Sequence, residues 1–173
     1  MILFFYLCAE QGTIGWLITY FKDTGILPKE YSQITSSIQW IMILIGRLLV
    51  AYCGAKYSLR YIYRIMGIGF VMFFLLLIFA NNPIIILIGI AGFGFSMAGI
   101  YPTTVALAGD VIKKYELSWS FILTFASLGS IIMPTIIGIV SDNFGVHIGM
   151  STIAIVTFLD FLLILYRSKS IKK

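Results

Sequence analysis

The chain has 173 residues, of which 60% are apolar and only 11% are charged. Soluble domains carry about 25% charged residues, so this composition excludes an ordinary water-soluble globule. The formal net charge of +5 gives no case for a nucleic-acid partner, because the basic residues lie at the edges of apolar runs, where membrane orientation accounts for them.

Six apolar runs, bounded by charged or turn-forming residues, predict an all-α membrane protein with six spans in one bundle. The predicted spans are residues 2–21, 31–53, 61–80, 84–109, 118–140 and 148–166. Asn81-Asn82-Pro83 interrupts the uncharged stretch from Ile65 to Gly109 and indicates a helical hairpin. The first run lacks a basic n-region and a small-residue cleavage site, so we expect a true span rather than a signal peptide.

Basic residues are distributed unevenly between the two sides of the membrane that six spans define. One side, with both termini, receives ten of the twelve: Arg47, Lys56, Arg60, Arg64, Lys113, Lys114, Arg167, Lys169, Lys172 and Lys173. The other side receives Lys22 and Lys29. Because Lys and Arg are in excess on the cytoplasmic side, the sequence predicts a multi-pass inner-membrane protein with both termini in the cytoplasm.

The first predicted span divides into distinct faces when its residues are placed at about 100° intervals. One face is polar and aromatic and carries Tyr6, Glu10, Thr13, Trp16 and Tyr20. A roughly opposite face carries small residues at a spacing that lets another helix approach closely, namely Cys8, Gly12, Gly15 and Thr19. A helix between a polar cavity and a neighbouring helix is expected to show this division, whereas a simple anchor is not.

The second predicted span carries a polar stripe that ends in a cation: Ser32, Ser36, Gln39, Ile43 and Arg47. Arg47 either snorkels to the interface or pairs with Glu10 or Asp160, which lie at a similar depth, on the order of 9 to 13 Å from the cytoplasmic span ends. One cation neutralises one carboxylate, and a buried unpaired carboxyl favours its neutral form. Glu10 is therefore expected either to carry a proton or to make an interhelical hydrogen bond, and Asp160 to snorkel or pair.

The fourth predicted span carries a seam of small residues that predicts close packing against a neighbouring helix: Gly89, Gly92, Ser96, Gly99, Thr103 and Ala106. Pro102 and Pro134 bend the fourth and fifth spans, and such breaks either mark a substrate site or are ordinary kinks. Tyr101 and Trp16 lie beside them and either stack on a sugar ring or a cation, or fill the membrane core.

Nothing in the sequence favours an enzyme, a cofactor or a metal site. Cys8 and Cys53 lie in apolar runs, which argues against a disulfide framework or a zinc site. There is no phosphate-binding loop, and the single histidine, His147, falls in a predicted external loop. We therefore expect no catalysis, no cofactor and no resident metal.

Several segments together resemble the C-terminal six-helix half of a major facilitator superfamily transporter, and the fucose-permease-like sugar porters in particular. The stretch from Tyr6 to Tyr20 is similar to that group's seventh helix, Gly46-Arg47 to a pair in the eighth, and Gly99 to Thr103 to the tenth. The run from Gly129 to Gly145 resembles the eleventh helix and its exit. The loop from Gly54 to Arg60 stands where the superfamily has a Gly/Asp/Arg motif but lacks the Asp.

This resemblance implies two six-helix bundles with the substrate bound between them and alternating access by rocking. The family's seventh and tenth helices line the central cavity, which places the polar face of the first span and Tyr101 in position to bind substrate. With the stripe of the second span, the predicted site comprises Glu10, Thr13, Trp16, Tyr20, Gln39, Arg47 and Tyr101. The implied partners are a small solute, protons, the lipid bilayer and a second half, either an N-terminal half or another copy.

The sequence therefore predicts secondary active transport of a small polar solute, a sugar in first place, coupled to protons. One alternative is a drug or other solute exporter of the same superfamily. Another is a stand-alone scaffold, channel or assembly protein. The division of the first span into polar and small-residue faces argues against this alternative. A membrane enzyme is disfavoured because histidines and clustered acids at the water interface are scarce.

Overall fold

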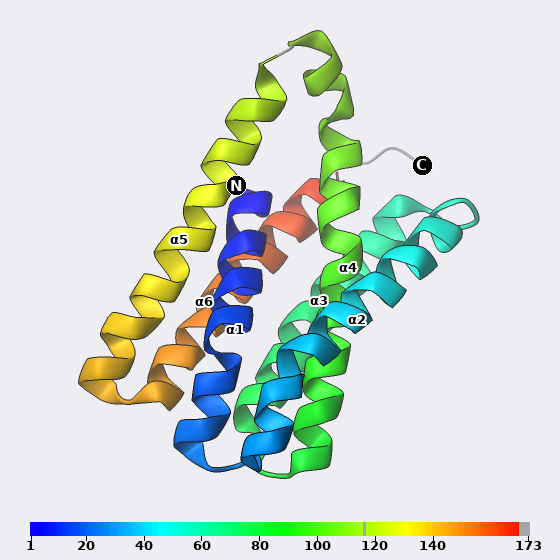
Figure 1. Ribbon diagram of the computed structural model, residues 1–173. Helices are drawn as coiled ribbons and strands as arrows, with labels where there is room; N and C mark the ends of the chain where they lie inside the picture. The colour runs from blue at the N-terminus through cyan, green and yellow to red at the C-terminus, as the bar shows by residue number, and fades with distance from the viewer. Residues whose placement is uncertain (116, 170–173) are drawn as a thin grey trace.

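The computed structural model describes residues 1–115 and 117–169, which form six long helices joined by short connections (Figure 1). The helices are α1 (Ile2–Thr24), α2 (Lys29–Gly54), α3 (Leu59–Phe79), α4 (Pro83–Lys114), α5 (Ser118–Phe144) and α6 (Val146–Lys169). Each is long and apolar enough to cross a membrane. The all-α prediction with six membrane-spanning helices is confirmed.

Most helices extend past the predicted spans, because a helix can continue through polar residues once it has left the apolar layer. The largest extension is in α4, which continues to Lys114 instead of ending at residue 109. At the predicted hairpin, α3 ends at Phe79 and α4 begins at Pro83, where the missing N–H of proline is harmless. Gly145 alone joins α5 to α6, with a positive φ of 91°, so His147 lies in the first turn of α6 and not in the predicted loop.

Packing divides the six helices into two groups of three. Helix α1 packs mainly against α5 and α6, and α4 packs mainly against α2 and α3. The first helix of each half of the chain, α1 or α4, thus packs against the second and third helices of the other half. This symmetry is the pattern of an internal repeat of three helices. Structural repeats of this kind occur in transporter bundles. Contacts of α1 with α2 and of α3 with α6 join the two groups.

Glycines bring the backbones of neighbouring helices close together around α4. A Cβ atom on Gly94 would lie 2.6 Å from the carbonyl oxygen of Gln39 in α2. A Cβ atom on Gly89, in the predicted small-residue seam, would lie 3.1 Å from the backbone of Leu77 in α3. Small residues allow such approach between helices in lipid. The close packing predicted for this seam is confirmed.

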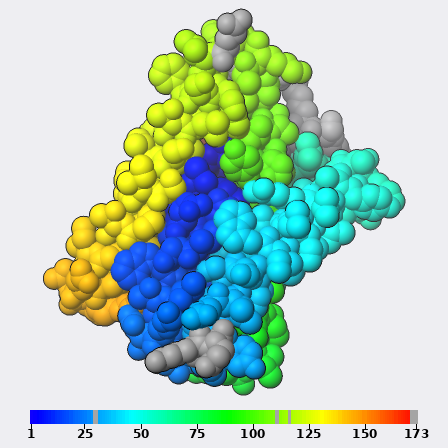
Figure 2. All heavy atoms as spheres, viewed as in Figure 1, coloured from blue at the N-terminus to red at the C-terminus, as the bar shows by residue number. Residues whose placement is uncertain are grey.

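One face of the bundle is hollowed over α1. Figure 2 shows α1 recessed between α5 on one side and α2 on the other. Both flanking helices expose large apolar side chains, among them Leu44 and Leu48 of α2 and Phe121 and Ile131 of α5. An apolar surface of this extent is expected where a helix faces lipid or another bundle.

Candidate functional site

Three helices bring two charged and two aromatic side chains together. Tyr6 and Glu10 lie one turn apart on α1, and the Tyr6 hydroxyl donates a hydrogen bond to Oε1 of Glu10 at 3.0 Å. The ring of Tyr101 from α4 lies 5.7 Å from the Tyr6 ring, measured between centroids. The guanidinium carbon of Arg47 from α2 lies 6.0 Å from the centroid of the Tyr101 ring, at the outer limit of a cation–π contact. We call these four residues the Glu10 cluster.

Burial in the Glu10 cluster decreases from the carboxylate to the cation. Tyr6 is fully buried, Glu10 is 5% exposed, Tyr101 is half-buried and Arg47 is exposed. No ion pair or hydrogen bond joins Arg47 to Glu10 among the described residues, and the contacts that connect them run through the rings of Tyr101 and Tyr6. Arg47 therefore lies at the exposed edge of the cluster, near the ring of Tyr101, and the Glu10 carboxylate is buried behind it.

Trp16, another residue of the predicted site, joins α1 to α5. Its indole Nε1 donates a hydrogen bond of 3.0 Å to the carbonyl oxygen of Pro134. The ring packs over Gly138, where a Cβ atom would lie 3.2 Å from Cζ2 of the indole. The N–H of Trp16 thus serves helix packing at the proline of α5, while the ring stays half-buried.

Replacing Trp16 with Phe is expected to lower the free energy of unfolding by about 0.5–1.5 kcal/mol, the usual net value of one hydrogen bond. The substitution keeps an aromatic ring over Gly138 and removes the donor to Pro134. Thermal unfolding of the purified protein in detergent measures the change. Trp40→Phe on α2, where the side chain is 46% exposed, is the matched control and should leave stability unchanged. Equal stability of both variants would contradict the structural role of the Trp16 hydrogen bond.

Thr13, Tyr20 and Gln39 of the predicted site are fully buried. The Thr13 hydroxyl donates to the backbone carbonyl one turn back at 2.7 Å, and the Tyr20 hydroxyl lies 3.5 Å from a backbone carbonyl near the end of α3. Nε2 of Gln39 contacts the sulfur of Met97 at 3.7 Å, while its Oε1 has no hydrogen-bond partner among the described residues. Of the seven predicted residues, the structure thus brings Glu10, Arg47 and Tyr101 together and gives each of the others a separate environment.

Asp160 contradicts the expectation that it snorkels or pairs. Its side chain is 0% exposed, and both carboxyl oxygens lack a hydrogen-bond partner in the part of the chain that the structure describes. Helix α6 packs against α1, α3 and α5, and Asp160 lies on the face that these helices cover. The prediction was wrong because distance from the helix end does not reveal which way a side chain points.

Two polar contacts were missed from the sequence. Tyr6 was placed on the polar face of the first span but not in the site, although its four-residue spacing from Glu10 makes the two side chains neighbours on a helix. The hydroxyl groups of Tyr63 in α3 and Thr104 in α4 are hydrogen-bonded at 2.7 Å. No local pattern connects these two residues, because they lie 41 positions apart.

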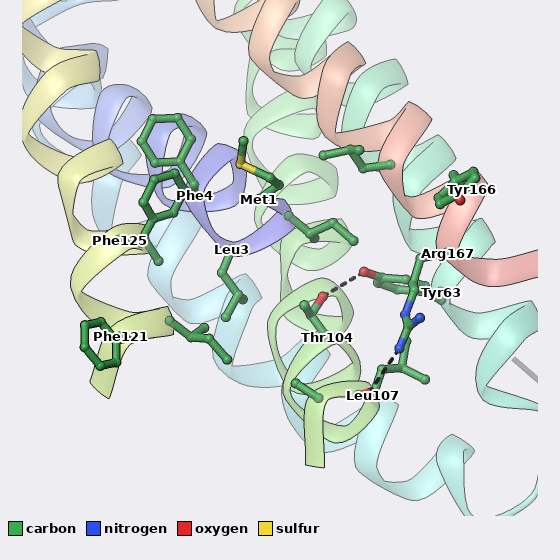
Figure 3. Close-up of a pocket in the computed structure, with 15 residues that line it drawn as sticks. Met1, Leu3, Phe4, Tyr63, Thr104, Leu107, Phe121, Phe125, Tyr166 and Arg167 are labelled. Atoms are coloured by element: carbon green, nitrogen blue, oxygen red, sulfur yellow. Dashed lines mark hydrogen bonds between the residues drawn. The ribbon is translucent and has the colours of Figure 1, made fainter. Parts of the chain in front are cut away.

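A cavity of about 530 Å³ lies at the end of the bundle where α1 begins. Its lining comes from α1, α3, α4, α5 and α6, and is mostly apolar, with Tyr63, Thr104 and Arg167 as polar members (Figure 3). No residue of the Glu10 cluster lines it. Among residues 1–115 and 117–169, no group of three or more His, Cys, Asp or Glu side chains is placed to hold a metal ion.

Comparison with known proteins gives matches over most of the chain. It is 30% identical over 112 residues to the glucose/mannose transporter GlcP of Bacillus subtilis, a match that covers 64% of this chain and 28% of that protein. It is 24% identical over 147 residues to major facilitator superfamily domain-containing protein 4A of Danio rerio, covering 84% of this chain and 28% of that protein. It is 24% identical over 149 residues to a TsgA homolog of Yersinia pseudotuberculosis, covering 85% and 38% respectively.

The chain thus spans about a third of the length of the curated relatives that it matches. The family model of the Major Facilitator Superfamily matches residues 1–173, and the structure has six helices long and apolar enough to span a membrane. The chain is a multi-pass membrane protein and belongs to the Major Facilitator Superfamily, whose members are transporters.

Proposed function

We propose that this chain forms part of a secondary active transporter that moves a small polar solute by alternating access, and that this solute is a sugar. The Glu10 cluster carries the proposal, because α1, α2 and α4 bring a carboxylate, a guanidinium and two phenol rings together within membrane-spanning helices. Ionisable residues cost at least about 2.5–3.5 kcal/mol at the centre of a bilayer on insertion scales, so those present are candidates for a substrate pathway.

The chemistry of the Glu10 cluster suits a sugar. A sugar ring has an apolar face and several hydroxyl groups, which act both as donors and as acceptors. The half-buried ring of Tyr101 offers a stacking surface, the Glu10 carboxylate accepts hydrogen bonds, and the Arg47 guanidinium donates them. Similarity to a protein described as a glucose/mannose transporter supports this substrate class.

The proposal includes a second six-helix bundle, either an N-terminal half or another copy, that covers the hollowed face over α1 (Figure 2). In transporters built from repeats, substrate sites lie at the interface between the repeats. We also propose that both termini face the cytoplasm of an inner-membrane protein, because that side receives ten of the twelve basic residues.

Proton coupling belongs to the same proposal, with Glu10 as the carrier. The Tyr6 hydroxyl donates a hydrogen bond to its carboxylate, and the cation of Arg47 belongs to the same cluster. Protonation of Glu10 turns an acceptor into a donor and removes its attraction for the cation. A proton bound at Glu10 would therefore change how the cluster holds both Arg47 and a solute.

Cells that express the protein are expected to accumulate labelled glucose or mannose saturably, and a protonophore is expected to abolish the accumulation. Glu10→Gln keeps the shape of the side chain but cannot bind and release a proton. This variant should lose protonophore-sensitive accumulation and still allow the solute to move down its concentration gradient. Asp23→Asn, at the exposed end of the same helix, is the matched control. If Glu10→Gln keeps proton-coupled uptake, Glu10 is not the proton carrier. If the cells export dyes and take up no sugar, the protein is an exporter and not a sugar transporter.

A further inference from the structure

A second acid lies inside the bundle, outside the Glu10 cluster. Asp160 of α6 is 0% exposed, and no described residue hydrogen-bonds to either of its carboxyl oxygens. An ionised carboxylate that is buried without a partner is far more costly than the neutral acid. The side chain is therefore suited to hold a proton rather than a charge.

Helices α1 and α3, which pack against α6, carry buried titratable groups. These include the thiol of Cys8 and the phenol of Tyr63, and neither donates a hydrogen bond to Asp160. Glu10 lies two positions beyond Cys8, on a different face of α1, and its carboxylate accepts the Tyr6 hydroxyl.

Two arginines on α3 and α6 hydrogen-bond to groups other than Asp160. Nε of Arg64 in α3 donates to the Ser168 hydroxyl at 2.8 Å, and Nη2 of Arg167 in α6 donates to a backbone carbonyl of α4 at 3.4 Å. Helix α5, which also packs against α6, has Asp142 as its titratable residue, close to the opposite end of the bundle. The surroundings of Asp160 thus offer little to stabilise its charge.

The cavity at the end of the bundle reaches a pair of hydroxyl groups on α3 and α4, and α3 packs against α6, the helix that carries Asp160. Figure 3 shows Tyr63 and Thr104 facing each other in the wall of the cavity, joined by their hydrogen bond. The Thr104 hydroxyl donates to the carbonyl oxygen of Ile100 at 2.7 Å, so the Tyr63 hydroxyl is the donor to Thr104. The phenol oxygen of Tyr63 therefore keeps an acceptor site for a further donor, such as a water or a protonated carboxyl group.

We propose that Asp160 is a proton-binding site in the core of the bundle, which exchanges its proton with water in the cavity through the Tyr63–Thr104 hydroxyl pair. In the binding step, a proton from water forms an O–H bond with a carboxylate oxygen of Asp160 and gives the neutral acid. Release breaks that bond and returns the proton to water. The proposal goes beyond the transport function, because it depends neither on the solute nor on the Glu10 cluster.

Infrared difference spectroscopy of the purified protein in lipid tests this site through the carbonyl stretch of a protonated carboxyl group in apolar surroundings. The wild type is expected to show this band at neutral pH and to lose it reversibly as the pH rises. Asp160→Asn should lack the band, and Glu10→Gln should keep it. A hydrophobic carbodiimide, which modifies protonated carboxyl groups, should label Asp160 in the wild type, as located by mass spectrometry.

The exchange route is tested with Tyr63→Phe, which keeps the ring and removes the hydroxyl. After a rapid rise in pH, loss of the band should be several-fold slower in Tyr63→Phe than in the wild type. Tyr166→Phe is the matched control, because Tyr166 lines the same cavity but is 76% exposed. An equal rate in Tyr63→Phe would overturn the route.

Two outcomes would overturn the site itself: absence of the band and of carbodiimide labelling in the wild type, or a band that no rise in pH removes. The wild-type titration and labelling decide the question even where Asp160→Asn fails to fold. They are also independent of sugar uptake, so failure of this proposal and failure of the proposed transport function are separate results.

Discussion

Replacing Arg47 with Gln is expected to weaken the apparent affinity for the transported sugar by roughly 10- to 150-fold, which corresponds to the loss of about 1.5–3 kcal/mol for hydrogen bonds to a charged group. Arg47 lies at the exposed edge of the Glu10 cluster, over the ring of Tyr101, so its loss removes the charged donor that a solute would meet first. Because the side chain is exposed, the variant should fold normally. The KM of labelled sugar uptake measures the change.

Two further variants separate a specific role of Arg47 from a general effect of charge. Arg47→Lys keeps the charge but has neither the planar fork nor the stacking surface of a guanidinium, so its KM should lie between those of the wild type and Arg47→Gln. Lys56→Gln removes a cation from the connection between α2 and α3, where Lys56 lies 4.5 Å from the centroid of the exposed Tyr52 ring. This variant should leave KM unchanged. Equal KM values in the wild type and Arg47→Gln would remove Arg47 from the substrate site.

Replacing Gly94 with Ala is expected to lower the free energy of unfolding by about 1–3 kcal/mol, the usual cost of overpacking a tight interior. The added Cβ would lie 2.6 Å from the carbonyl oxygen of Gln39, which is backbone and cannot move aside as a flexible side chain does. Helices α2 and α4 must therefore separate. Thermal unfolding in detergent measures the loss, and resistance to limited proteolysis in membranes gives an independent readout.

Gly109→Ala is the matched control for Gly94→Ala. Both glycines lie in α4, but nothing lies within 4 Å of a Cβ atom added at Gly109. Alanine favours a helix over glycine by about 1 kcal/mol, so this control should be unchanged or slightly more stable. Equal destabilisation of the two variants would contradict the close approach of α2 and α4.

Much of the fold could be predicted from the sequence, because an apolar run of about 20 residues is long enough to cross the bilayer as a helix. The length of such a run is a local property of the sequence. The turn at Asn81-Asn82-Pro83 and the small-residue seam of α4 were likewise predicted from neighbouring residues along one helix. Three members of the Glu10 cluster could be selected in the same way. Glu10, Arg47 and Tyr101 were selected by type and position, and the structure brings them together.

The partners of the other polar residues could not be predicted from the sequence. Trp16 donates to Pro134, which lies 118 positions away, and Tyr63 bonds to Thr104 across two helices. Asp160 occupies a covered face of α6, although its distance from the helix end suggested an exposed or paired side chain. Each of these outcomes depends on how one helix is rotated against another.

The sequence by itself determined that this chain forms six helices long and apolar enough to cross a membrane. Only the tertiary structure decided which charge lies near an aromatic ring, which carboxyl group among the described residues lacks a hydrogen-bond partner, and where a cavity opens. The physical reason is that whether a segment crosses the bilayer as a helix depends on its own composition. The rotation and crossing angle of each helix depend instead on close packing between side chains that are far apart in the chain.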